Sequence, residues 1–318
     1  MKFTKPALSI PDQLAKLKAR GLIVADDNYA EHYLRYVDYY RLSAYTLPFQ
    51  DGLANGKPFK SGTTFDHVLE LYRFDRDLRL LVLDAIERTE IALRSVMNNE
   101  MSLRHNPHWF MDAAHFSTRP NFNYARFIAD IESELNIQTH GALPTRQHQE
   151  LFIGHYYTKY GDPYLPPSWM VMETFSLGTL SLLFNNLAQG PERVAIASYF
   201  GTDEFMLRNW FHVLSHVRNL CAHHSRLWNR QLVIKFRQVA HKHKSFLSTT
   251  DRMYAVAVVL HDILKKVAPN TDWHLRLREL FSKYPIVPLA PMGFPANWQT
   301  EFFWNFPPSP KNASTPAP

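Results

Sequence analysis

Arg218, Asn219 and His223 lie within the segment Arg-Asn-Leu-Cys-Ala-His, and their side chains could act together on a phosphodiester. Histidine suits proton transfer near neutral pH because its ordinary pKa is about 6.5. The planar guanidinium of arginine can bind two phosphate oxygens at once and stabilise a phosphorane. Asn219 could orient His223 or donate to the phosphate. These residue types therefore predict metal-free RNA cleavage, in which the 2′-hydroxyl attacks its own phosphate.

This chemistry requires both a base and an acid, and one histidine cannot easily serve as both in the same turnover. A second copy of the segment, contributed by a second chain, would supply the missing group. We therefore expect a homodimer with a composite site across its two-fold axis.

A helix that starts at Thr202 or Asp203 and runs to about Trp228 would carry these residues. Two faces separate along it. One is apolar, with Met206, Trp210, Val213, Val217 and Leu220, and the other is polar, with His212, His216, Asn219 and His223. Arg218 and His223 lie roughly 140° apart around such a helix, but a long arginine side chain can lean toward the imidazole.

The charge distribution around this segment favours an anionic partner. The net charge of the chain is +6, and no acidic residue occurs between Glu204 and Asp251. Trp228 and Phe236 interleave with the cations of that stretch, a pattern typical of nucleic-acid surfaces. The candidate RNA-binding residues are Arg226, Arg230, Lys235, Arg237, Lys242 and Lys244. His241 and His243 are expected on the same solvated or RNA-facing patch.

Two other functions are compatible with the residues. The first is a metal-dependent phosphohydrolase of the HD type, using His261-Asp262 with His212 and His216 as ligands. The second is a non-catalytic module that holds a partner RNA with the same basic stretch. Glu173, on an apolar helix, is a candidate partner for Arg218 or for another cation of the core.

The composition excludes several classes of protein. Hydrophobic residues make up 46% of the 318 residues, which is enough for a large core, and only 11 are glycine. Neither a G-x-G-x-x-G sequence nor a Walker-type loop is present, and the single cysteine, Cys221, cannot form an intrachain disulfide. No cofactor and no metal site is expected. The lack of a signal peptide or a long apolar stretch predicts a cytoplasmic protein without membrane segments.

The hydrophobic periodicity predicts an all-α fold. We expect a long helix over 65–101 that could break near Arg73, a loop-rich stretch over 141–167 and a tail from Pro285 rich in proline. The aromatic residues at the start of that tail should pack on the body, and Asn312–Pro318 should be disordered. Further helices are expected at 10–20, 28–42, 124–136, 169–187, 191–199, 252–267 and 273–284.

Residues 218–223 resemble the R-x4–6-H signature of HEPN ribonucleases, with the polar residue typical after the arginine. Other segments resemble the AbiD/AbiF abortive-infection family, and the matches run from about Leu14 to Trp298. The matching segments are Tyr36–Tyr45, Phe74–Leu80, Asp84–Arg88, Trp169–Glu173 and Met292–Pro295.

The resemblance implies a HEPN-like helical bundle with ribonuclease-type function in phage defence and association with a structured non-coding RNA. It also implies that Arg218, Asn219 and His223 are the active-site residues. It also implies three regions: an N-terminal helical region over 1–60, a HEPN-like helical domain over 61–284 and a Pro-rich tail over 285–318.

Overall fold

The computed structural model describes residues 2, 6–54, 56–118, 122–136, 151–237, 243–244 and 247–305. Within these residues the backbone forms helices and connecting turns, with isolated bridges in place of any β-sheet. The predicted all-α class is therefore confirmed. No helix of the described part combines the length and apolar character needed to cross a membrane.

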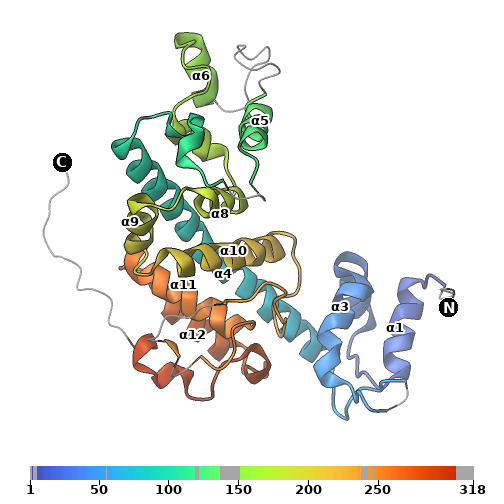
Figure 1. Ribbon diagram of the computed structural model, residues 1–318. Coiled ribbons are helices and arrows are strands. Elements are labelled where there is room, and N and C mark those ends of the chain that lie inside the picture. Colours follow the sequence, from blue (N-terminus) through green and yellow to red (C-terminus); the bar gives the residue numbers. More distant parts are fainter. Residues whose placement is uncertain are drawn as a thin grey trace, which may run out of the picture.

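The long helix α4 (Phe65–Arg104) runs through the whole molecule and organises it (Figure 1). Thr64 and His67 form a reciprocal capping box at its start, and its 40 residues span about 60 Å. The break considered near Arg73 is absent. The Arg73 guanidinium instead donates to the hydroxyls of Tyr29, at 2.6 Å, and Tyr33, at 2.8 Å, which fixes this turn against the N-terminal helices.

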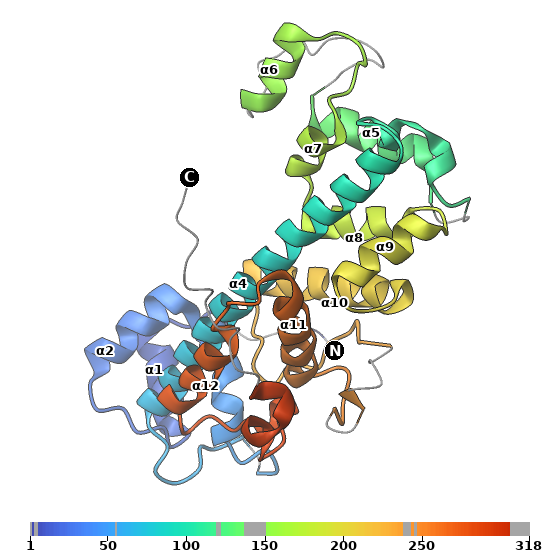
Figure 2. The same ribbon diagram turned by 90° about the vertical axis from the view of Figure 1, so that its left-hand side faces the viewer.

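The N-terminal helices pack at one end of α4, and α5 (Tyr124–Glu134) and α6 (Leu151–Lys159) lie at the other end (Figures 1 and 2). The helix α1 (Ile10–Ala19) is capped by Ser9, whose hydroxyl accepts the Asp12 N–H. The helix α6 corrects the expectation of a loop over 141–167; residues 141–150 of that stretch lie outside the described residues.

The predicted helix over 28–42 is divided into three parts. These are α2 (Asp27–Tyr33), a π-helical turn over Leu34–Asp38 and α3 (Tyr39–Thr46). Asp38 has φ 84°, a conformation rare for a residue other than glycine. Its carboxylate accepts the Tyr40 N–H at 3.2 Å and so caps α3. This local hydrogen bond compensates for the interrupted helix.

The predicted helix over 169–187 is also interrupted. The short helix α7 (Ser168–Val171) continues as a 3-10 turn over Met172–Thr174, and α8 (Leu177–Asn186) then starts in a new direction. The Ser176 hydroxyl accepts the Thr179 N–H and caps α8. A capping serine competes with continuation of the helix, which explains the error.

Four further helices complete the body, and all contact α4. They are α9 (Pro191–Tyr199), α10 (Glu204–Ala222), α11 (Met253–Val267) and α12 (Trp273–Lys283). Six of the seven tryptophans are almost completely buried: Trp109, Trp210, Trp228, Trp273, Trp298 and Trp304. These six therefore build the core rather than a binding surface, whereas Trp169 is 44% exposed.

The C-terminal segment folds back onto α11 and α12 through 3-10 turns at Ala290–Met292, Trp298–Thr300 and Phe302–Trp304. The expected packing of this tail is confirmed for Trp298 and Trp304, whereas Phe302 is exposed. The Trp304 ring stacks on His261, with centroids 4.9 Å apart and an interplanar angle of 10°. The segment Asn312–Pro318 lies outside the described residues.

His261 is held neutral by this packing. Burial lowers its pKa to about 3, and the nearby charges of Lys265 and His274 act in the same direction. Its Nε2 lies 3.2 Å from the Phe303 carbonyl oxygen, which can only accept, so Nε2 carries the proton. Within the described residues Nδ1 has no hydrogen-bond partner, so a second proton on Nδ1 would have no acceptor.

His261 should therefore make the fold less stable in acid. The unfolded chain takes up the proton below pH 6.5, whereas the folded protein resists it down to about pH 3, so unfolding becomes easier across that window. By linkage the loss at pH 5 is on the order of 2 kcal/mol. In urea titrations at pH 7 and pH 5, His261→Phe should lose less stability between the two pH values than wild type. The exposed His212→Gln serves as control, and an unchanged pH dependence in His261→Phe would contradict the account.

Candidate functional site

The helix α10 is fixed at its start and along its buried face. The Asp203 carboxylate accepts the N–H groups of Phe205 and Met206, each at 2.9 Å. The buried side chains of the helix pack against α4, α8 and α9. Cys221, in its last turn, is 1% exposed, and burial raises the pKa of its thiol to about 12. The buried set is Leu207, Trp210, Phe211, Val213, Leu214, Val217 and Cys221.

The opposite face of α10 carries the predicted polar residues. His212, Asn219 and His223 are exposed, and His216 is half-buried. Burial lowers the pKa of His216, and the positive charge of Arg230 adds to this effect. His216 is therefore neutral at physiological pH and able to accept a proton.

The helix ends at Ala222, earlier than the predicted Trp228. His224 has φ 54°, its N–H bonds to the Cys221 carbonyl at 3.0 Å, and the Ser225 N–H bonds to the Leu220 carbonyl at 2.9 Å. These are the paired bonds of a Schellman motif, with histidine in the left-handed position that glycine usually fills. His223 consequently becomes the cap residue of the helix, and its ring is exposed.

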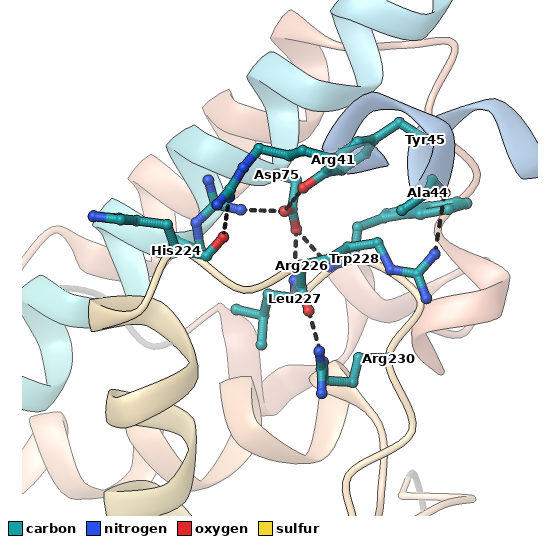
Figure 3. Close-up of polar contacts among 10 residues, drawn as sticks. Arg41, Ala44, Tyr45, Asp75, His224, Arg226, Leu227, Trp228 and Arg230 are labelled. Atoms are coloured by element: carbon teal, nitrogen blue, oxygen red, sulfur yellow. Dashed lines mark hydrogen bonds and ion pairs between the residues drawn. The ribbon is translucent and has the colours of Figure 1, made fainter. Parts of the chain in front are cut away.

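A buried carboxylate, Asp75 of α4, captures the chain just beyond this turn (Figure 3). Its Oδ1 accepts the N–H groups of Leu227, at 2.9 Å, and Trp228, at 2.5 Å. Its Oδ2 accepts the Tyr45 hydroxyl at 2.6 Å and forms an ion pair with Arg79. Burial, with the Asp75 charge beside it, raises the pKa of Tyr45, so that hydroxyl remains a donor.

Two arginines tie the same turn to α3 (Figure 3). Arg41 donates from Nη1 to the His224 carbonyl at 2.6 Å, and Arg226 donates from Nη1 to the Ala44 carbonyl at 3.2 Å. The turn that carries His223 is therefore positioned by residues from α3 and α4. Sequence reasoning assigned no role to Asp75, although an Asp75–Arg79 pair at helical spacing within an otherwise apolar face is a signal for a buried ion pair.

Arg218 lies on the side of α10 that faces α4. It lines a hollow of about 590 Å³ together with Glu87, Glu90 and Arg94 of that helix. Burial raises the pKa of Glu90, while the positive charges of Arg218 and Arg94 oppose that rise. The Arg218 guanidinium donates to the Asn219 side-chain oxygen at 3.4 Å.

Within one chain, Arg218 and Asn219 are thus in contact with each other. His223 lies beyond them at the end of the same helix, and no hydrogen bond within the described residues joins its ring to either. Glu173, considered as a partner for Arg218, instead pairs with Arg94 at 3.1 Å and is largely exposed, so it is no core ion pair.

A groove of about 1140 Å³ lies beside the polar face of α10, between α8, α10 and residues 233–237. Asn209 fixes its wall, because its side chain donates to the Lys235 carbonyl at 3.3 Å and accepts the Arg237 N–H at 2.8 Å. Of the described residues that line it, the basic ones are Arg208, His212, Lys235 and Arg237, and none carries a carboxylate. This combination gives the groove a positive potential suited to a polyanion.

The six candidate RNA-binding residues differ in their surroundings. Lys235 and Arg237 line the groove, Lys244 is exposed, and Lys242 lies outside the described residues. Arg226 and Arg230 are half-buried, and the Arg230 Nε donates to the Arg226 carbonyl at 2.7 Å. Arg208 and His212 belong to the groove but were assigned no RNA contact from sequence, although both fall in the acid-free stretch.

His243 corrects the expected solvated patch, because it is completely buried. It stacks on Trp210, with centroids 6.3 Å apart, and its Nε2 lies 3.5 Å from the Asp262 carboxylate. Its neighbour in the predicted patch, His241, lies outside the described residues.

The ligand set of the HD-type alternative is not assembled. His261 and Asp262 are buried on α11, whereas His212 lines the open groove on α10. The described part of the chain contains no group of three His, Cys, Asp or Glu side chains that could hold a metal ion.

The described part of the chain defines the class of the molecule: an all-helical protein with a basic groove beside the polar face of α10, and no carboxylate among the described residues that line this groove. Residues 32–229, more than half of the chain, match the model of the Abi-like protein family, and the chain belongs to that family. The resemblance of its motifs to the abortive-infection family is therefore confirmed as membership of the Abi-like family. No curated protein and no solved structure is detectably similar to the chain.

Asp75→Ala should destabilise the protein strongly. It leaves the buried Arg79 guanidinium and two backbone N–H groups without their acceptor, at a cost of about 3–5 kcal/mol. Asp84→Ala on the same helix is the matched control, because its partly exposed pairs with Arg88 and Arg276 contribute about 0–1 kcal/mol each. Urea denaturation measures both, and equal losses would show that Asp75 has no special role.

Proposed function

We propose that this Abi-like protein binds RNA along α10 and acts in phage defence as a metal-independent endoribonuclease. The observation that carries the proposal is the groove, whose described lining includes Arg208, His212, Lys235 and Arg237 and no carboxylate. The polar face of α10 continues from this groove through His216 and Asn219 to His223. A strand bound by its phosphates in the groove could extend along that face to the Arg-Asn-x-x-x-His segment.

The proposed reaction is transesterification within the RNA strand. His223 accepts the proton of the 2′-hydroxyl, whose oxygen attacks the adjacent phosphorus. Arg218 stabilises the charge of the phosphorane, and Asn219 positions the Arg218 guanidinium through its side-chain oxygen. As the bond to the 5′-oxygen breaks, a second imidazole protonates that oxygen. The His223 of a second copy of the chain supplies this acid, which makes the proposed site composite and the protein a homodimer.

A second candidate is a non-catalytic RNA-binding module that associates with a structured non-coding RNA. One observation favours it: within a single chain Arg218 faces the carboxylates of α4, and no hydrogen bond in the described residues connects it to His223. RNA binding without cleavage, unchanged in His223→Ala, would support this module over the nuclease.

Arg218→Ala and His223→Ala should each abolish RNA cleavage and toxicity while the fold stays intact, since neither side chain is part of the buried core. His224→Gly is the matched control, because it removes the neighbouring imidazole at a left-handed position that glycine readily adopts. It should cleave like wild type. Cleavage of a labelled RNA is followed on gels, and activity retained in both alanine variants excludes this site.

Mixed dimers separate a composite site from a self-contained one. Wild type and His223→Ala are refolded together in varying ratios. If the site needs both imidazoles, the activity should be proportional to the square of the wild-type fraction. A linear decrease would mean that each chain acts alone.

Lys235→Glu with Arg237→Glu should weaken RNA binding and flatten its salt dependence. Each lost phosphate contact lowers the slope of log affinity against log salt by about 1. Lys159→Glu, an exposed reversal on α6, is the control. Arg226 and Arg230 are less suitable test positions because Arg226 donates to the Ala44 carbonyl of α3 and Arg230 donates to the Arg226 carbonyl, so both help to hold the turn. Fluorescence anisotropy with labelled RNA at several salt concentrations provides the measurement, and affinity insensitive to salt would refute the electrostatic account.

A further inference from the structure

The segment Tyr36–Tyr45 contains four tyrosines, and they divide into two kinds. Tyr45 is 1% exposed and bonded to Asp75, and Tyr39 packs partly against the core. Tyr36 and Tyr40, in contrast, are 73% and 83% exposed. Large aromatic rings usually gain free energy by burial, so two such rings left in water within five residues require an explanation.

The backbone between these two tyrosines is held in a rare conformation. Asp38 lies between them with φ 84°, and its carboxylate caps the Tyr40 N–H. Such conformations are costly and persist where the surrounding structure enforces them, often at functional sites. The Tyr36 ring contacts His32, with centroids 4.8 Å apart, whereas Tyr40 has no ring partner among the described residues.

The segment that carries the two rings is hydrogen-bonded to the turn of the proposed RNA site. Arg41 follows Tyr40 directly and donates to the His224 carbonyl at 2.6 Å, next to His223 (Figure 3). Arg226 joins the same turn to Ala44 of α3. Arg41 and the preceding Arg35 add positive charge at the segment, and its one acid, Asp38, is engaged by the Tyr40 N–H. Exposed aromatic rings flanked by arginine are the elements with which proteins bind unpaired nucleobases.

We propose that Tyr36 and Tyr40 stack unpaired bases of a single-stranded RNA segment next to the His223–His224 turn. The inference rests on the proposed RNA function and adds the form of the substrate: a strand whose bases are free at this point. The basic groove holds phosphates, whereas the tyrosines hold bases. RNA binding in the groove should therefore depend on salt, whereas binding at the tyrosines should depend on the presence of the bases.

The test measures the affinity of the full-length protein for a fluorescein-labelled oligouridine, for the same oligomer with abasic positions and for a blunt RNA duplex. Tyr40→Ala and Tyr36→Ala should each weaken oligouridine binding roughly 5- to 100-fold, the range for loss of one base–aromatic stack. The salt slope should stay as in wild type, because no phosphate contact is lost. Tyr40→Phe should bind like wild type, since the ring is kept.

Two comparisons make the result specific. Tyr199→Ala is the matched control, because Tyr199 is also exposed but lies on α9. The abasic oligomer should bind wild type and Tyr40→Ala equally, and duplex binding should not change in either tyrosine variant.

The proposal is overturned if the double variant Tyr36→Ala/Tyr40→Ala binds oligouridine like wild type. It is also overturned if that variant changes the mass of the protein in light scattering without changing RNA affinity, because the rings would then contact a second copy. Failure of the proposed function gives a different result, in which wild type binds none of the three RNAs.

Discussion

The carboxylate of Asp75 joins three parts of the chain that are distant in sequence. It receives a hydroxyl from α3, a guanidinium from its own helix and two backbone N–H groups from the segment after α10. A charge buried this deeply is tolerated only when its hydrogen-bonding capacity is filled, and here four donors fill it. The end of α10, the path of Arg226–Arg230 and the proximity of α3 to His223 all depend on this arrangement.

This arrangement selects one conformation of the chain more than it adds net stability. A buried ion pair contributes little net stability compared with apolar residues of the same volume, but removing one partner is expensive. Competing paths for the chain after Ala222 would leave the buried Oδ1 of Asp75 without the two backbone N–H groups that donate to it. The cluster therefore selects one conformation for the turn that carries His223 and His224, and a defined geometry is what a proton-transfer group requires.

Much of the fold follows from local signals. The capping Ser9, the first-turn Pro191 and the apolar periodicity of α4, α11 and α12 predict elements close to those observed. The predictions fail where a residue distant in sequence determines the local structure. Nothing between Asn219 and Trp228 resembles a helix stop, since His224 occupies the position where glycine would signal one, and the bonds that hold the turn come from Arg41 and Asp75. The interruption at Asp38 likewise has no glycine or proline to mark it.

The candidate site was predictable in part for the same reason. The acid-free stretch and the polar face of α10 are visible in the sequence, because both depend only on residue type and helical period. The membership of Lys235 and Arg237 in a groove with Arg208 and His212 depends on how residues 233–237 return to α10 through Asn209. The burial of His243 against Trp210 and Asp262 is equally a property of tertiary packing.

The single thiol of the chain gives these arrangements a native reporter. Cys221 lies two residues before His223 and is almost completely enclosed, and burial raises the pKa of its thiol to about 12, so very little reactive thiolate exists while α10 is docked. Alkylation must then proceed through openings that free the last turn of this helix. The rate of modification by a thiol reagent therefore follows how often that turn leaves the body, in the unaltered protein and without an engineered label.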